Sequence, residues 1–333
     1  MTAKTTYADF AGYMLRPQLS DIKSRGADCD PATNIGAFLL GLPVISANML
    51  HITGPKMCLA MAEGGAMGIL PRFKPVDDAV AEFRETETLF AEKKPPNNHF
   101  GVSIGVKEGE RARFDALYYA GARIFCIDVA HGHHTMVRDM LQWIRKNYAT
   151  EPFVIAGNIA TSEAASDLQE WGASALKVGI GSGAACQTRQ NTGVGVSQAK
   201  ALNEVVSVAQ VPVISDGGVR EYGDVAKALA CGADAVMVGL LFAGTIETPG
   251  RVYEDDRGNF YKVYGGSASG ENKVAAGGSN SFVEGVMKVV PFRGHVKYIL
   301  RGIREGLQSA MSYSGARNMK EYYTKAKLEK LEE

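Results

Sequence analysis

A glycine-rich segment with a single cysteine is the part of this chain best suited to covalent chemistry. The segment GIGSGAACQTRQNTGVG spans residues 179–195, with Cys186 near its centre. Glycines let backbone N–H groups line a concave loop, and such groups beside a cysteine favour the nucleophilic thiolate. Thr188 follows two residues later and can donate or relay a proton beside the sulfur. A lone cysteine is more often a small buried residue, so this interpretation depends on where the loop lies in the fold.

Polar residues and glycines also end several apolar runs, and two of these ends suit a phosphate. SDGG at 215–218 and VGL at 238–240 resemble loops in which glycine N–H groups approach an anion. Asp216 precedes the two glycines and is placed to accept a hydrogen bond from a ribose hydroxyl. The pattern therefore predicts a phosphorylated ligand or cofactor, and a flavin phosphate is one candidate. The residues that end the runs are Asn48, Asp128, Asn158, Gly179, Gly181, Asp216, Gly217, Gly218 and Gly239.

Eight short apolar runs must position these residues. They cover 42–48, 66–71, 99–105, 123–128, 152–158, 175–181, 211–218 and 234–240. Nearly all are continuously apolar, as is typical of parallel strands covered on both faces. Segments with helical spacing separate them, at 54–63, 76–92, 108–120, 135–146, 162–171, 197–208 and 222–231. Eight strands favour an α/β fold of the closed (β/α)₈ TIM barrel type over a doubly wound open sheet, and barrels carry their chemistry at the carboxyl ends of the strands.

Glycines occur directly after several helical segments and also within one long segment that follows the eighth strand. Gly64, Gly121, Gly172 and Gly232 follow helical segments and suit helix C-termini. A long segment at 248–290, rich in Gly, Ser and Asn, separates the eighth strand from the expected closing helix at 296–311. We expect this segment to be structureless and to act as a mobile flap over the site, with a disordered surface loop as the alternative.

Composition excludes several classes of function. The 333 residues include 36 Lys+Arg and 36 Asp+Glu, so a basic surface for nucleic acid or an acidic membrane is not expected. The five cysteines form no CxxC pair, which disfavours a disulfide framework and a zinc site. His131, His133 and His134 invite a metal interpretation, but no carboxylate cluster accompanies them. We find no secretory signal and no apolar run long enough for a membrane helix, and we predict a cytoplasmic protein.

Long motifs then give a resemblance over nearly the whole chain. They are MLRP (14–17), ANM (47–49), IDVAHG (127–132), IAGN (155–158), KVGIGSGAACQTRQNTGVG (177–195), SDGG (215–218), GDVAKALACGADAVMVG (223–239), EG (284–285) and VPFRG (290–294). In their order and length they resemble the IMP dehydrogenase/GMP reductase family of (β/α)₈ barrels.

The resemblance implies roles for particular residues. Cys186 would attack C2 of a purine nucleoside monophosphate to form a thioimidate, and Asp216 would bind the ribose. Nucleotide contacts would also come from Asn48, Met49, Gly217, Gly218, Gly239, Leu240, Gly265, Gly266 and Ser267. A nicotinamide cofactor would lie against Asp128, Ala130, Gly132 and Asn158. The carbonyls of Gly181, Gly183 and Cys186 would hold K⁺ or another monovalent cation, and a homotetramer is implied.

The flap decides between the two branches of the family. The dehydrogenase hydrolyses its intermediate with an Arg–Tyr pair on the flap, and no arginine occurs between Gly258 and Glu284. Thr188 and Glu284 match the residues that protonate the departing amine in the reductase. We therefore predict NADPH-dependent reductive deamination of GMP to IMP and ammonia, with NADH as a possible donor. The alternatives are an NAD-dependent IMP dehydrogenase forming XMP, a related enzyme acting on an unusual purine nucleotide, a noncatalytic nucleotide-binding barrel and a flavin barrel.

Four positions depart from the family pattern near the expected ligand, and they leave the purine base open. They are Leu50, Arg72, Leu240 and Gly266. Between residues 71 and 99 there is room for one helix, so the paired regulatory module (CBS type) inserted there in many dehydrogenases of the family is not expected. We predict one catalytic domain over residues 1–333, with the flap at 248–290.

Overall fold

Eight parallel strands close into a barrel in the computed structural model, which describes residues 9–265 and 287–331. The strands are β4 (Val44–Ser46), β5 (Met67–Leu70), β6 (Phe100–Ile104), β7 (Ile124–Asp128), β8 (Phe153–Ile159), β9 (Ala175–Val178), β10 (Val213–Asp216) and β11 (Ala235–Val238). Each strand pairs with the next, and β11 pairs with β4 in the register Val236↔Val44. This closure confirms the predicted barrel and excludes the doubly wound sheet.

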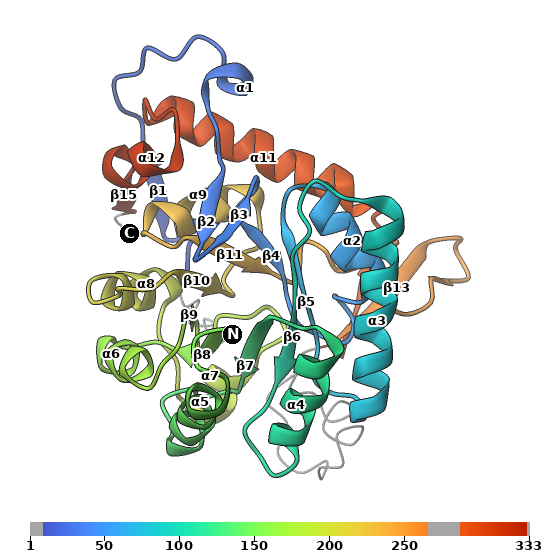
Figure 1. Cartoon of the computed structure of the whole chain (residues 1–333). Coiled ribbons are helices and arrows are strands. Elements are labelled where there is room, and N and C mark those ends of the chain that lie inside the picture. Colours follow the sequence, from blue (N-terminus) through green and yellow to red (C-terminus); the bar gives the residue numbers. More distant parts are fainter. Residues whose placement is uncertain (1–8, 266–286, 332–333) are drawn as a thin grey trace.

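Helices surround the barrel and lie close to the predicted segments (Figure 1). They are α2 (Pro55–Glu63), α3 (Val76–Lys93), α4 (Glu110–Ala120), α5 (Thr135–Tyr148), α6 (Ser162–Glu170), α8 (Gln198–Val206), α9 (Tyr222–Ala230) and α11 (Val296–Tyr313). Gly121 ends α4 with φ +121°, whereas Gly172 and Gly232 follow the last residues of α6 and α9 with φ +105° and +93°. These left-handed conformations favour glycine. No helix among the described residues is long and apolar enough to cross a membrane.

Most strands are shorter than the predicted apolar runs, and in some of them glycines turn the chain out of the barrel before the run ends. The run at 175–181 is the clearest case. Strand β9 stops at Val178, and the next residues include Gly179 with φ +149° and Gly181 with φ +81°. Both are left-handed conformations that a side chain would strain. The last part of the run therefore belongs to the loop that leads to Cys186.

The segment expected to be a structureless flap instead contains an antiparallel sheet. It is built from β12 (Tyr253–Glu254), β13 (Phe260–Gly265) and β14 (Met287–Pro291), in the register Val263↔Val289, and Figure 1 shows it projecting beside the barrel. Lys262 anchors it, since its buried Nζ donates to the carbonyls of Thr245 and Thr248 at 3.1 and 2.5 Å. The expectation was wrong for these residues because the alternating run FYKVY was overlooked beside the glycines. Residues 266–286 lie outside the described part.

Short elements that were not predicted from the sequence complete the described part of the chain. They are α1 (Arg25–Asp28), α7 (Thr188–Thr192), α12 (Met319–Lys325), the β1/β15 pair (Tyr13–Arg16 and Lys327–Lys330) and the β2/β3 hairpin (Thr33–Ile35 and Phe38–Leu40). Phe38 packs edge-on against Phe153 at the start of β8, with ring centroids 5.2 Å apart. The hairpin therefore lies against the amino end of the barrel, opposite the end expected to carry the chemistry.

An aromatic cluster between α4, α5 and β7 gives a test of the core. Phe114 is fully buried and stacks on Phe125 with a centroid distance of 4.2 Å. Replacing Phe114 by alanine should leave a cavity and lower the free energy of unfolding by about 3–5 kcal/mol. Tyr119 on the same helix is 79% exposed, and its alanine variant should lose less than about 1 kcal/mol. Urea denaturation checks both, and equal losses would contradict this account of the core.

Candidate active site

The structure brings Cys186 and Thr188 into contact after β9. Cys186 Sγ lies 3.0 Å from Thr188 Oγ1, and the Thr188 N–H donates to Sγ at 3.4 Å. Cys186 is partly exposed, whereas Cys29, Cys58, Cys126 and Cys231 are buried. Of the five thiols, Cys186 is therefore the one a ligand can reach, with a hydroxyl and an N–H beside it.

A buried lysine joins the polar residues at the ends of three strands. Lys177 of β9 is 1% exposed, and its Nζ donates to Asp128 Oδ1 at 2.9 Å and to Asp216 Oδ2 at 2.7 Å. It also donates to Asn158 Oδ1, and Asn158 Nδ2 donates to Asp216 Oδ2 at 2.8 Å. Asp128, Asn158 and Asp216, singled out separately in the sequence, thus form one cluster around an ammonium group.

Charge balance decides the ionisation of this cluster. Burial by itself raises the pKa of Asp128, but the positive charges of Lys177 and Arg72 outweigh it and hold the pKa below its ordinary value. Burial also opposes the charge on Lys177, yet Asp128 and Asp216 raise its pKa above the ordinary value. The lysine therefore stays protonated and Asp128 stays ionised near neutral pH. An ionised carboxylate can accept hydrogen bonds from sugar hydroxyls.

Two further side chains, Asn48 and Arg72, contact Asp128. Asn48 is buried, donates to Ser103 Oγ at 2.9 Å and helps to lower the pKa of Asp128 through a hydrogen bond. Arg72, one of the departures from the family pattern, donates through Nε to the Asp128 carbonyl at 3.0 Å and lies over the Phe73 ring. Arg72 therefore belongs to the same polar cluster.

The loop after β7 follows the end of β8 closely. The Gly132 N–H donates to the Asn158 carbonyl at 2.7 Å, and a Cβ at Gly132 would lie 3.0 Å from that oxygen. Ala130 is exposed on this loop. Asp128, Ala130, Gly132 and Asn158, the expected cofactor contacts, thus share one rim of the barrel.

The expected phosphate loops also meet at this end. Gly217 and Gly218 have φ of +102° and +78°, and a Cβ at Gly217 would lie 2.3 Å from Ser182 Oγ. The Gly218 N–H donates to the Ser182 carbonyl at 3.0 Å. A phosphate could use this N–H only if that bond were released.

The second phosphate loop opens onto a small space. A Cβ at Gly239 would meet Met49 Sδ and the Tyr264 hydroxyl, each at 3.5 Å, and Leu240 beside it is partly buried. Tyr264 is buried at the end of β13, and burial, with the charges of Asp216 and Cys186, raises its pKa. Strand β13, within the predicted flap, therefore brings a phenol close to the predicted nucleotide residues.

One of the carbonyls proposed for a monovalent cation already accepts a hydrogen bond. The Gly183 carbonyl accepts the Cys186 N–H at 3.0 Å, and Lys288 Nζ donates to the neighbouring Ala184 carbonyl at 2.7 Å. A carbonyl oxygen has two lone pairs, so Gly183 keeps capacity for a second contact. The cation site formed by Gly181, Gly183 and Cys186 remains a prediction.

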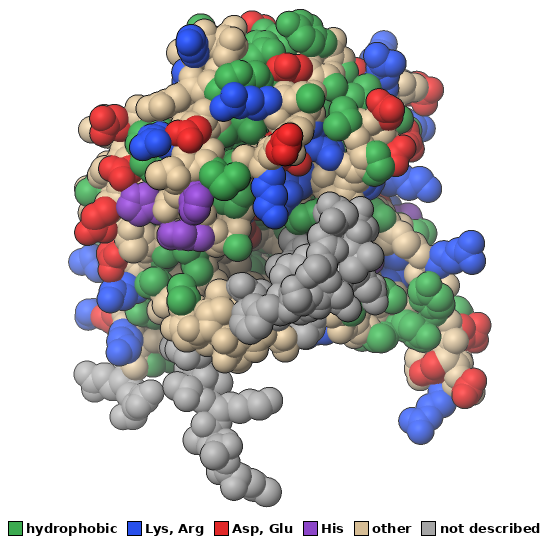
Figure 2. All heavy atoms as spheres, turned by 90° about the horizontal axis from the view of Figure 1, so that it is seen from below, with side chains coloured by type: hydrophobic (Ala, Val, Ile, Leu, Met, Phe, Trp, Pro, Cys, Tyr) green, Lys and Arg blue, Asp and Glu red, His purple; other side chains and the backbone are tan. Residues whose placement is uncertain are grey.

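Three expected site residues lie outside the described part of the chain: Glu284, Gly266 and Ser267. The histidines have other roles: His133 Nε2 lies 2.8 Å from Asp167 Oδ2, and His134 Nδ1 accepts the Met136 N–H at the start of α5. Figure 2 shows histidine side chains gathered on one face. No group of three or more potential metal ligands occurs in residues 9–265 and 287–331.

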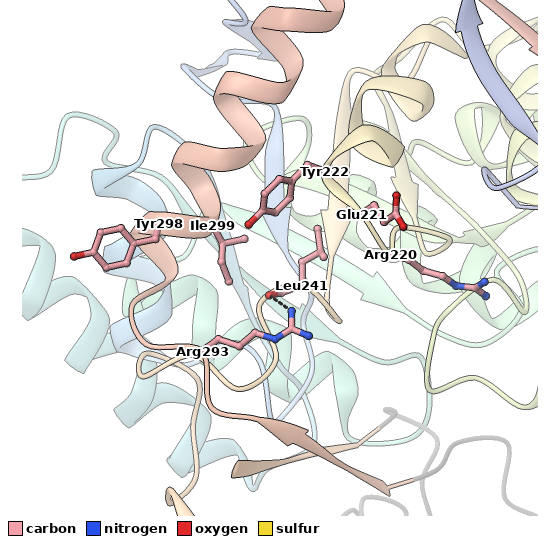
Figure 3. Close-up of a pocket in the computed structure, with 7 residues that line it drawn as sticks. All are labelled: Arg220, Glu221, Tyr222, Leu241, Arg293, Tyr298 and Ile299. Atoms are coloured by element: carbon pink, nitrogen blue, oxygen red, sulfur yellow. Dashed lines mark hydrogen bonds between the residues drawn. The ribbon is translucent and has the colours of Figure 1, made fainter. Parts of the chain in front are cut away.

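A separate pocket of about 620 Å³ lies between the start of α9, the loop after β11 and α11 (Figure 3). Arg293 donates to the Leu241 carbonyl at 3.3 Å in its wall. It is lined by Arg220, Glu221, Tyr222, Leu241, Arg293, Tyr298 and Ile299. None of the predicted site residues is among them.

Sequence reasoning missed the part played by two residues. Lys177 opens the long cysteine motif but received no role, although a lysine inside a strand of the buried barrel requires a charged partner. Tyr264 ends the strand that was itself overlooked. Recognising FYKVY as a strand would have directed attention to this phenol.

The site and fold together define a (β/α)₈ barrel with an accessible cysteine beside a carboxylate-rich cluster. A family model described as the IMP dehydrogenase / GMP reductase domain matches residues 5–333. The chain belongs to the IMP dehydrogenase/GMP reductase family. It is 40% identical to a GMP reductase of Leptothrix cholodnii over 315 residues, and 39% identical to one of Pediococcus pentosaceus over 316, with 93% of this chain and 92% of the relative covered in each case.

A solved structure agrees with these relatives. It is a cysteine-to-alanine variant of GMP reductase from Trypanosoma brucei in complex with guanosine 5'-monophosphate. That structure matches with a TM-score of 0.89 and 25% identity, covering 100% of this chain and 96% of the other. The relatives indicate an oxidoreductase on the GMP reductase side of the family.

Proposed function

We propose that this chain catalyses the NADPH-dependent reductive deamination of GMP to IMP and ammonia. The observation that carries the proposal is the 3.0 Å contact between Cys186 Sγ and Thr188 Oγ1 at the carboxyl end of the barrel. It is supported by relatives named GMP reductase over 93% of the chain. We also take residues 1–333 as one catalytic domain acting in the cytoplasm as a homotetramer.

The cysteine loop performs the first half of the reaction in this proposal. Cys186 Sγ attacks C2 of the guanine, the bond from C2 to the exocyclic nitrogen breaks, and ammonia leaves a thioimidate on the sulfur. Thr188 and Glu284 together deliver the proton that the departing amine needs. Asp216 holds the ribose, and Met49, Gly239 and Leu240 lie along the nucleotide.

The residues around Asp128 suit a nicotinamide nucleotide, because an ionised carboxylate accepts hydrogen bonds from ribose hydroxyls. A bound NADPH would supply the hydride that converts the thioimidate at C2 into IMP and releases the sulfur. Asp128, Ala130, Gly132 and Asn158 orient this cofactor. The pairing with Lys177 keeps the Asp128 acceptor ionised.

A screen of purine monophosphates with reduced and oxidised nicotinamides tests the proposal. With GMP and NADPH we expect loss of the nicotinamide absorbance and one ammonia per NADPH consumed. Absence of turnover with GMP under reducing conditions would refute the proposal. IMP with NAD⁺ is the comparison reaction, and XMP formation there would instead favour the dehydrogenase. Tight nucleotide binding without covalent capture would favour a noncatalytic barrel.

A further inference from the structure

The side chain of Arg189 runs through the loop that carries Cys186. A Cβ at Gly181 would lie 2.5 Å from Arg189 Cγ, and one at Gly195 would lie 2.6 Å from the same atom. Both glycines also have positive φ, +81° and +152°. Because glycine has no Cβ, Gly181 and Gly195 leave room for the Arg189 side chain to pass between them.

The arginine ends on a buried carboxylate that comes from the other end of the chain. Arg189 Nη1 and Nη2 donate to Asp9 Oδ2 and Oδ1 at 3.1 and 2.7 Å. Arg189 is 7% exposed and Asp9 is 3% exposed. Arg189 Nη2 also donates to the Val196 carbonyl, where the loop ends. Such a two-pronged contact fixes orientation as well as distance.

Asp9 is in turn tied to the barrel through Gln198. Asp9 Oδ1 accepts the Gln198 N–H at 3.1 Å, and Gln198 Nε2 donates to the Val178 carbonyl at 2.7 Å and to Ser215 Oγ at 3.1 Å. Ser182 Oγ donates to Gln198 Oε1 at 2.8 Å. The network thus spans the ends of β9 and β10, the cysteine loop and the chain near Asp9.

Helix α7 needs this support, because it has five residues and begins at Thr188. A single turn of helix is unstable by itself, so tertiary contacts must hold it. Arg189 is the residue next to Thr188, and its side chain joins the helix to the barrel. The contact between Thr188 and Cys186 therefore depends on the placement of α7.

We propose that the buried Asp9–Arg189 pair is a positioning device that holds Thr188 and Cys186 in reacting geometry. The proposal rests on the proposed role of Cys186 as nucleophile. Neither side chain touches the reacting atoms. Their loss should slow the chemical step at Cys186 and leave nucleotide binding largely unchanged.

The test compares Asp9→Asn, Arg189→Met and Arg189→Lys with wild type. We expect kcat with GMP and NADPH to fall about 10- to 100-fold in Asp9→Asn and Arg189→Met, because small displacements of catalytic groups have effects of this size. KM for GMP should change less than about threefold, and capture of an electrophilic purine nucleotide analogue at saturation should slow in parallel. Arg189→Lys keeps the charge and should recover part of the loss.

The matched control is Arg145→Met. Arg145 donates to Gly172, Ala149 and Pro152 carbonyls and to Ser174 Oγ, before β8 and β9 at the far end of the barrel. It should lose stability but keep kcat and the capture rate per folded molecule. If Asp9→Asn and Arg189→Met, measured per folded molecule, keep the wild-type kcat and capture rate, the positioning role is refuted. Wild type without turnover or capture would refute the proposed function itself, and this inference with it.

Discussion

Cys186→Ala is expected to reduce the rate of GMP reduction by roughly 10⁴-fold or more, since a covalent route needs its nucleophile. Asp216, Asn158 and Lys177 are untouched by the change, so the affinity for GMP should stay within about threefold of wild type. Steady-state kinetics and equilibrium binding measure the two effects. Mass spectrometry should show the purine analogue on wild-type protein and not on the variant.

Cys231→Ala is the matched cysteine control. Cys231 is buried, and burial raises the pKa of its thiol to about 12, so it remains protonated and unreactive. Its loss should leave turnover and the mass adduct unchanged. Wild-type turnover by Cys186→Ala would mean that the reaction does not pass through this sulfur.

Lys177→Met is the second large expected effect, because it removes the buried cation that the partly buried Asp128 and Asp216 share. Breaking a buried ion pair by removing one partner costs about 3–5 kcal/mol. We expect a loss of this size in the free energy of unfolding at pH 7.5, together with loss of turnover. Lys177→Arg keeps a positive charge and should lose less.

The loss should shrink as the pH falls. In wild type the pKa of Asp128 is lowered, so its contribution to stability is complete above its ordinary value near 3.8 and is lost as the pH falls through the lower folded value. In the variant the lysine no longer lowers the pKa of Asp128, so this pKa should rise and protonation of Asp128 at mildly acidic pH should restore part of the lost stability. Urea denaturation at pH 7.5 and 5.0 measures the difference.

Lys262→Met provides the comparison for that experiment. Lys262 is also buried, but the described acceptors of its Nζ are the carbonyls of Thr245 and Thr248, which do not titrate. Its variant should lose stability by a similar amount at both pH values. If Lys177→Met behaves in the same way, the charge balance assigned to Asp128 is wrong.

The barrel could be predicted because each of its strands has a recognisable pattern in the local sequence. Covered parallel strands such as β7 and β8 are continuous apolar runs, and glycines mark the ends of helices such as α4. Strand β13 has a local signal, the alternating run FYKVY, which was overlooked. Its pairing with β14 could not be predicted in the same way, because these strands are separated by the residues after Gly265 and pairing between distant segments leaves no local pattern.

In the site, too, contacts between residues close in sequence could be predicted, and contacts between distant residues could not. Cys186 and Thr188 are neighbours in sequence, so their contact follows from the motif alone. The bond from Lys177 to Asp128 and Asp216 joins three strands, and the pair of Arg189 with Asp9 joins residues that lie 180 positions apart. Such contacts depend on the register of the strands and on how far each side chain extends, and neither can be deduced from composition or from the spacing of residues.

The seam between β4 and β11 has a consequence for the folding rate of this chain. Val44 meets Val236 there, so the barrel closes only after nearly two hundred residues have been ordered in between. Pairings between such distant segments slow folding, because the entropy of closing a long loop is lost before the contact forms. Hydrogen-exchange labelling during refolding should find the amides of β7 and β8, which are close in sequence, protected before those of β4.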